Sequence, residues 1–128
     1  MRFDDWEKRL NEYLSQVGPF QWGENDCCLF AANGVLAMTG QDYAKQYRGY
    51  KTAKGALGKL KDLGVDGVTT KALGQPKPPM MAKRGDVVAF ESGNGLALGL
   101  CIGAKIAAVG ADGLIMLPIN QALSAWSV

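Results

Sequence analysis

The character of the sequence changes near residue 82, and this change restricts the fold more than any other feature. Before it, apolar residues recur at three- and four-residue steps, as they do from Arg2 to Val17, which indicates amphipathic helices. After it, four short apolar runs are each bounded by Gly, Asn or Asp, which is typical of strands joined by tight turns. Helices followed by consecutive strands predict an α+β domain, with N-terminal helices packed on a C-terminal antiparallel sheet of about four strands.

Glycine, proline and capping residues set the bounds of the expected elements. The predicted helices cover residues 2–17, about 27–38, 42–49 and 53–63. The predicted strands cover residues 86–92, 96–103, 105–110 and 113–119, and residues 120–126 are expected to form one helical turn. Prolines make the stretch from Gln75 to Met81 an extended connection. The second helix is nearly all apolar, so we expect it at the centre of a single domain that spans residues 1–128.

The charge and the cysteine content exclude several classes of protein. A formal net charge of +2, from 14 basic and 12 acidic residues, is too small to indicate binding to nucleic acid or to an anionic membrane. The most apolar run, residues 96–110, is interrupted by Lys105 and is too short to span a bilayer. The N-terminal stretch lacks the apolar core of a signal peptide. Two of the three cysteines are adjacent, which argues against a disulfide framework, so we expect a soluble protein in a reducing compartment.

Cys27 and Cys28 stand at the expected start of the second helix, after Asn25 and Asp26, either of which can cap it. A thiol at a helix N-terminus is a common arrangement for a cysteine nucleophile. A cysteine peptidase also needs a base for the thiol and a proton donor for the leaving amine, and the chain contains no histidine. Without a base, a thiol with a pKa near 8.5 is only about 3% ionised at neutral pH.

Four stretches, in the same order along the chain, resemble the NlpC-type cysteine peptidases, which are compact papain-like enzymes that cut peptide bonds in bacterial cell wall. These stretches are Pro19–Gly23, Asp26–Leu29, Gly85–Phe90 and Ala97–Gly103. The resemblance implies a papain-like fold, with Cys27 at the position of the nucleophile and facing the strand that carries Ala97.

The chain departs from the peptidase pattern at the positions that carry its chemistry. The general-base histidine corresponds to Ala97, and the polar residue that would orient it corresponds to about Ala108. Phe20 replaces a tyrosine whose hydroxyl reaches the active site in the peptidases, and Cys28 replaces the serine after the nucleophile. Removing one member of a catalytic triad costs several orders of magnitude in rate. The resemblance therefore implies a papain-like fold without hydrolytic activity.

A second resemblance covers almost the whole chain. Several motifs are similar to those of a family whose members occur among the tail genes of tailed phages and proteobacterial prophages. These motifs are Trp22–Ala32 with its Asp-Cys-Cys, Thr39–Asp42, Tyr50–Ala56, Arg84–Val88 and Ala97–Cys101. This resemblance implies a virion protein, a structural or adaptor component of the tail tip that is assembled in the host cytoplasm and binds tail hub or tip proteins.

Alternatives remain open for the cysteines. The first is an active cell-wall peptidase or amidase that binds peptidoglycan peptide, with Cys27 as nucleophile and an unconventional base. The candidate bases are Glu24, Glu91 and Asn94, together with Asp26 next to Cys27. A carboxylate with a pKa near 4 matches a thiol poorly at pH 7 unless it is desolvated. The second alternative is that Cys28 and Cys101 are small buried apolar residues.

No cofactor is expected, and no metal site is predicted. Three thiols without histidine or a CxxC pair make a weak zinc signature, even with Cys101 close to the adjacent pair. Two surfaces are candidates for binding a partner. One is the loop that carries Phe20 and Trp22, and the other is the extended stretch that carries Pro78 and Met80. Each surface either contacts a partner or packs against the domain's own core.

Overall fold

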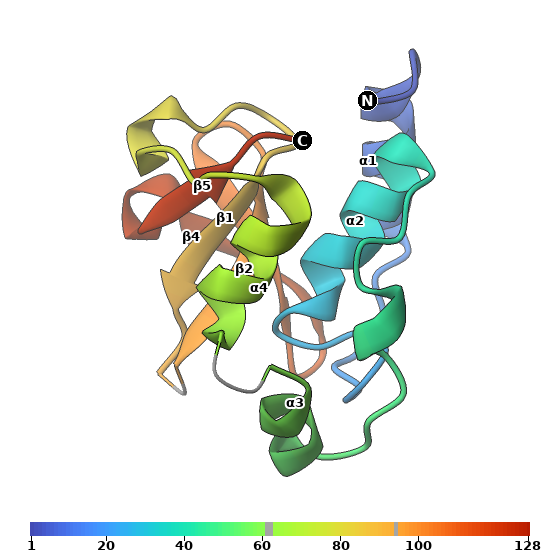
Figure 1. Ribbon diagram of the computed structural model, residues 1–128. Helices are drawn as coiled ribbons and strands as arrows, with labels where there is room; N and C mark the ends of the chain where they lie inside the picture. The colour runs from blue at the N-terminus through green and yellow to red at the C-terminus, as the bar shows by residue number, and fades with distance from the viewer. Residues whose placement is uncertain (61–62, 94) are drawn as a thin grey trace.

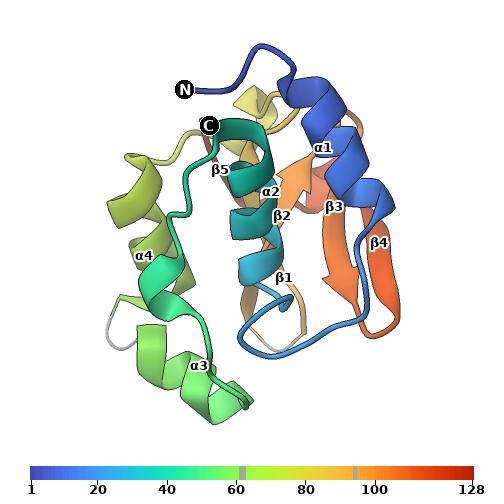
Figure 2. The ribbon, with the colours of Figure 1, turned by 90° about the vertical axis from the view of Figure 1, so that its right-hand side faces the viewer.

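Helices pack on a face of an antiparallel sheet in the computed structural model, which describes residues 1–60, 63–93 and 95–128, without the side chain of residue 57. Within these residues the α-helices are α1 (Trp6–Ser15), α2 (Leu29–Thr39), α3 (Ala53–Leu60) and α4 (Gly64–Leu73). The strands are β1 (Val87–Glu91), β2 (Leu96–Cys101), β3 (Lys105–Gly110), β4 (Gly113–Pro118) and β5 (Ser124–Trp126). Their order in the sheet is β4-β3-β2-β1-β5. Figure 2 shows α1 and α2 running side by side across the sheet, and α2 contacts β2 and β3. The predicted α+β class is confirmed.

The sheet contains one strand more than the sequence predicted. The four predicted strands are present as β1 to β4. The helical turn expected at residues 120–126 is confirmed only at its start, where residues 120 and 121 belong to a short 3-10 helix, η3 (Ile119–Gln121). The end of the segment instead forms β5, which pairs antiparallel with β1. Ala125 and Trp126 are both fully buried, in clusters on opposite faces of the sheet. A strand places successive side chains on opposite faces, and one helical turn does not, so burial of both residues requires the extended backbone.

The first two helices begin later than predicted. α1 starts at Trp6 rather than at residue 2, because the Phe3 N–H donates to the carbonyl of Met38 at 2.8 Å and holds the first residues along the end of α2. α2 starts at Leu29 because Asp26 accepts hydrogen bonds from its first N–H groups and keeps the preceding residues in a turn. The prediction that this helix occupies the centre is confirmed, since α2 lies between α1 and the sheet.

The region between α2 and the sheet differs more from the prediction. Thr52 caps α3 as expected, and its hydroxyl accepts from the Gly55 N–H at 3.0 Å. That helix was predicted to end at residue 63; residues 61–62 lie outside the described residues, and Leu63 directly precedes α4. The short helix expected at residues 42–49 is a single 3-10 turn, η1 (Lys45–Tyr47).

α4 was not predicted, because its glycines and β-branched residues have low helix propensity. Tertiary contacts compensate for this low helix propensity. α4 packs against β2 and β5, and the indole N–H of Trp126 donates to the Thr70 hydroxyl at 3.1 Å. The Thr69 hydroxyl donates to the Val65 carbonyl at 2.7 Å, within the helix. Packing against the sheet therefore decides that these residues are helical.

The proline-rich stretch is extended only in part. Lys77 pairs with Ala125 through two backbone hydrogen bonds of 2.7 and 3.1 Å, so this residue lies along the outer edge of β5. The chain then turns through a 3-10 helix, η2 (Pro79–Met81), which leaves Met80 88% exposed. This stretch thus covers one margin of the sheet and presents an apolar side chain to solvent.

The two faces of the sheet carry separate apolar clusters. The larger lies between the sheet and the helices, and its main members are Leu10, Phe30, Val35, Met38, Leu100 and Trp126. The smaller lies on the opposite face, and its buried members are Val88, Phe90, Ala97, Cys101, Ile106, Ala108, Ala122 and Ala125. Cys101 is 1% exposed, which agrees with its interpretation as a small buried apolar residue. No helix in the described part of the chain has the length and apolarity to cross a membrane.

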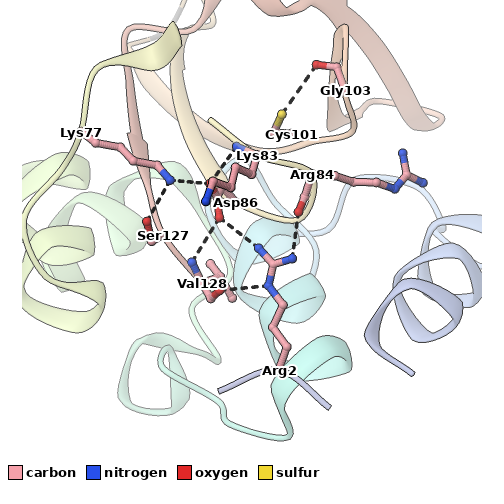
Figure 3. Close-up of polar contacts among 9 residues, drawn as sticks. All are labelled: Arg2, Lys77, Lys83, Arg84, Asp86, Cys101, Gly103, Ser127 and Val128. Atoms are coloured by element: carbon pink, nitrogen blue, oxygen red, sulfur yellow. Dashed lines mark hydrogen bonds and ion pairs between the residues drawn. The ribbon is translucent and has the colours of Figure 1, made fainter. Parts of the chain in front are cut away.

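Asp86 joins segments that are distant in the sequence (Figure 3). Its nearly buried carboxylate accepts from the Arg2 guanidinium at 3.0 Å and from the Lys77 ammonium at 2.7 Å. The backbone N–H groups of Lys83 and Val128 donate to the same carboxylate at 2.8 and 3.2 Å. The first and last residues, the proline-rich stretch and the start of β1 therefore meet at one charge.

Candidate functional site

The loop before α2 is built around the carboxylate of Asp26, which is fully buried. Its Oδ1 accepts from the N–H groups of Cys28 at 3.0 Å and Leu29 at 2.9 Å. Its Oδ2 accepts from the Gly23 N–H at 3.0 Å and from the hydroxyl of Tyr50. Both oxygens thus serve the first turn of the helix and the preceding loop. This network explains why Asp26 is needed here as a structural cap for the helix that follows the two thiols.

Cys27 and Cys28 are both partly buried, and their thiols interact. The Cys28 thiol donates a hydrogen bond to the Cys27 sulfur, and this bond lowers the pKa of Cys27, although burial and the Asp26 charge act in the opposite direction. The same hydrogen bond, together with burial, raises the pKa of Cys28 far above its usual range. Cys27 is therefore the more acidic and more nucleophilic of the two thiols.

Cys27 lies directly against the sheet. Its carbonyl accepts from the Leu98 N–H on β2 at 2.7 Å. Its side chain lines a pocket of about 330 Å³ together with Ala97 on β2 and Ala108 on β3. The structure therefore brings together the three positions that the sequence assigned to a degenerate catalytic site, and methyl groups stand at two of them.

The remaining polar residues of this small pocket are Glu91, Ser92 and Gln121. Among the candidate bases, Glu91 is thus close to the thiol, but its Oε1 accepts from the N–H groups of Gly93 and Gly95 at 3.2 and 3.0 Å, and the residue is exposed. Glu24 does not line the pocket, and Asn94 lies outside the described residues. Sequence reasoning missed Gln121, because only η3 carries it to the pocket.

Phe20 and Trp22 line a second and larger cavity on the other side of Cys27. Their rings meet edge to face with centroids 4.7 Å apart, and the Trp22 ring lies 6.4 Å from that of Tyr50. The cavity measures about 1050 Å³, and its walls come from α2, α3, α4 and β2, with both adjacent thiols at one end. Among the residues that the structure describes, no charged side chain lines it. The aromatic pair thus borders an apolar cleft and does not plug the core.

Tyr50, in the segment before α3, is the residue bonded to this loop that sequence reasoning did not single out. The motif that begins with it was noted only as part of the second resemblance. Its hydroxyl donates to Asp26, and burial is the main reason that its pKa is raised, with this hydrogen bond the next cause. No local pattern signals the contact, because the two residues lie 24 positions apart.

The carboxylate and the two thiols form a potential ligand set for a metal ion, since their donor atoms lie within 4.8 Å of one another. The Asp26 oxygens, however, already accept hydrogen bonds from four donors. That leaves two sulfurs, whereas a structural zinc site uses four protein ligands. Cys101 is not part of the group, and its thiol points to the Gly103 carbonyl at 3.7 Å. The donor set therefore favours thiol chemistry over a closed metal site.

Pro78 and Met80 lie apart from both cavities, since neither residue lines them. Met80, Met81 and Leu123 are 88%, 57% and 55% exposed. Their segments are adjacent, because η2 packs beside β5. We refer to Pro78, Met80, Met81 and Leu123 as the methionine patch.

Fold and site together define a small α+β domain in which two adjacent thiols directly precede the central helix. The chain belongs to the family described as a domain of unknown function (DUF6950), whose sequence model matches residues 1–128. A search of curated proteins found no match.

Proposed function

We propose that the protein is a papain-like domain without hydrolytic activity that serves as a structural or adaptor component of a phage tail tip. In this role it binds tail hub or tip proteins and becomes part of the virion. The proposal combines the two sequence resemblances with the arrangement of an apolar helix on an antiparallel sheet, which is compatible with a papain-like fold.

One observation carries the non-catalytic part of the proposal. Cys27 shares its small pocket with Ala97 and Ala108, the positions that the resemblance assigns to a general base and its orienting partner. A methyl group neither accepts the thiol proton nor donates one to a leaving amine. The chain has no histidine that a rearrangement could bring to these positions.

A second candidate function is a cell-wall cysteine peptidase or amidase. The observation in its favour is the hydrogen bond from Cys28, which lowers the pKa of the Cys27 thiol without any histidine. Gln121, in the same pocket, carries an amide N–H of the kind that stabilises an oxyanion. This candidate still lacks a proton donor for the leaving amine.

A hydrolysis assay distinguishes between the two candidate functions. Purified protein is incubated with peptidoglycan and with muropeptide fragments, and the products are separated by mass spectrometry, with Cys27→Ala as the matched control. The proposal expects identical fragment patterns for both proteins. Cleavage by the wild type that is lost in Cys27→Ala would establish the second candidate.

The adaptor role predicts that a surface of the domain holds a hub protein, and the methionine patch is the exposed candidate. Met80→Glu places a charge on a side chain that is 88% exposed, so the folded state should keep its melting temperature. We expect this variant to lose co-purification with the tail hub protein. Methionine side chains adapt to irregular apolar surfaces, and a carboxylate there would have to be desolvated.

Trp22→Glu is the comparison variant for the aromatic loop. Trp22 is half-buried against Phe20 and Tyr50, so the charge should lower the melting temperature. Loss of hub binding by Met80→Glu at an unchanged melting temperature supports the adaptor role. Undisturbed hub binding by both variants contradicts it.

A further inference from the structure

The two margins of the sheet differ in whether another segment of the chain pairs with them. At one margin, Lys77 pairs with Ala125 and covers the outer edge of β5. At the other margin, β3 is the only strand among the described residues that pairs with β4, and Figure 2 shows β4 as the outermost strand. In the described part of the chain, no backbone hydrogen bond outside the β3 ladder involves Leu114 or Met116. An open margin of this kind is a template for another strand.

The pairing with β3 decides which backbone groups face outward from β4. The Ile119 N–H donates to the Ala104 carbonyl at 3.0 Å, and hydrogen-bonded pairs alternate with non-bonded pairs along an antiparallel ladder. Counting back from Ile119 in steps of two, the residues of β4 that are bonded to β3 are Leu117, Ile115 and Gly113. The two-residue turn that joins Gly110 to Gly113 agrees with this alternation, because the pair that closes such a turn is a bonded pair. The backbone groups of Leu114 and Met116 therefore point to the open margin.

β4 lacks the features that protect an edge strand. Its sequence, GLIMLP, contains no charged residue, and Ile115 and Met116 are 40% and 42% exposed. Its one protective residue is Pro118, which stands at an outward position at the end of the strand, where it removes an N–H donor. The middle of the strand keeps its donors and acceptors.

We propose that a second copy of this chain pairs with β4, antiparallel and across a twofold axis at Ile115, to join the two sheets into one. In this register Leu114 of each copy lies opposite Met116 of the other, and the N–H and carbonyl of both residues are all paired. The two Ile115 side chains lie directly opposite each other on the same face. A shift by two residues places Leu114 opposite Pro118, whose missing N–H leaves a carbonyl of the strand itself unpaired, whereas in the proposed register Pro118 lies opposite Asp112, outside the strand.

Charge complementarity also favours a second copy. The same register places Asp112 of one copy opposite Pro118 of the other, and Pro118 is itself paired with Lys105 on β3. Asp112 and Lys105 of different copies thus lie on one face at roughly 10 Å between Cα atoms, two strand spacings apart. Both residues are exposed, and the twofold axis repeats the contact at the other end of the joint. An antiparallel pair of identical strands therefore matches in hydrogen bonding, apolar contact and charge.

Sedimentation equilibrium over a range of protein concentrations tests this dimer. We expect a reversible monomer–dimer equilibrium for the wild type. Ile115→Lys places two ammonium groups opposite each other at the twofold axis and should raise the dimer Kd at least about tenfold. Met80→Lys is the matched control, because it adds the same charge to an exposed side chain away from β4 and should leave the Kd unchanged. Circular dichroism shows whether each variant is folded.

Charge reversal tests the register. Lys105→Glu should weaken the dimer, and Lys105→Glu combined with Asp112→Lys should recover it, since the opposite charges face each other again. In the wild type, amide exchange at Leu114 and Met116 should slow as the concentration rises. A wild type that stays monomeric at all concentrations, or a dimer unaffected by Ile115→Lys, overturns the proposal. Failure of the double reversal to recover the dimer contradicts the antiparallel register.

Discussion

At the scale of single residues, the thiol loop depends on one carboxylate and one hydroxyl. Asp26 is fully buried, and its partners come from the loop, the helix start and Tyr50. A buried carboxylate needs such donors, because desolvation without hydrogen bonds would be costly. The pair Asp26–Tyr50 therefore links the loop before α2 to the segment before α3.

Removing the Tyr50 hydroxyl should destabilise the protein in a pH-dependent way. Tyr50→Phe takes a donor from a buried carboxylate, which typically costs about 1–3 kcal/mol at pH 7. The pKa of Tyr50 is raised in the folded state, so its contribution is fully present below the unfolded-state pKa of 10.0 and is lost as pH rises beyond it. Urea unfolding should show that the difference in unfolding free energy between wild type and variant is smaller above pH 10 than at pH 7. A constant difference at all pH values contradicts this role.

A separate prediction concerns the adjacent thiols. Cys28→Ala removes the hydrogen bond that lowers the pKa of Cys27, so less Cys27 thiolate should be present at pH 7. Mass spectrometry after brief iodoacetamide treatment should show slower alkylation of Cys27 in this variant. Cys101→Ala is the control, because Cys101 is buried and lies outside the thiol group. Equal alkylation of Cys27 in wild type and Cys28→Ala would exclude the proposed hydrogen bond.

At the scale of elements, α4 and β5 stabilise each other although 50 residues separate them. Neither was predicted in its observed form, since α4 has low helix propensity and β5 is only three residues long. The fully buried indole of Trp126 packs in the main cluster and donates to Thr70 on α4. One side chain thus holds a weak helix and a short strand in place.

Thr70→Val tests this contact. The substitution keeps the shape and the helix propensity but removes the acceptor, so the buried indole N–H is left unpaired. We expect a loss of about 1–3 kcal/mol in the free energy of unfolding, measured with urea. Thr70→Ser keeps the hydroxyl and should lose less. A larger loss in Thr70→Ser than in Thr70→Val would show that the methyl group, not the hydrogen bond, is the important contact.

At the scale of the whole molecule, Asp86 connects segments from both ends and the middle of the chain. Two cations and two backbone N–H groups, from segments near the beginning, middle and end of the sequence, meet at its carboxylate. Gly85 precedes it with a φ of 92°, a conformation that other residues adopt at a cost. The arrangement holds the N-terminal residues, the proline-rich stretch and β5 together.

Asp86→Asn should therefore act on global stability. It leaves Arg2 and Lys77 partly buried without a counter-charge, and breaking a buried pair in this way typically costs about 3–5 kcal/mol. Urea unfolding measures the loss. Asp5→Asn is the control, since its ion pair with Arg9 is exposed and joins the residue before α1 to the first turn of that helix, so it should change the unfolding free energy little. Similar losses in both variants would contradict a global role for Asp86.

Local patterns in the sequence were sufficient for much of the fold. Apolar periodicity and glycine-bounded runs predicted α1, α2, α3 and the first four strands, because each pattern reports how one element buries its own residues. The order of helices and strands predicted the α+β class. The resemblance to peptidases placed Cys27, Ala97 and Ala108 at one site, and these residues do line one pocket.

Features that depend on distant partners were decided by the tertiary structure alone. α4 is helical and residues 124–126 are extended because they pack against each other and against the sheet, which no local pattern encodes. Tyr50 reaches Asp26 and Gln121 reaches the thiol pocket only after the chain has folded. The sequence by itself determined the elements that bury their own apolar faces. The tertiary structure decided the contacts between distant partners that no resemblance had placed, because such a contact stabilises the fold only when both partners have been brought together.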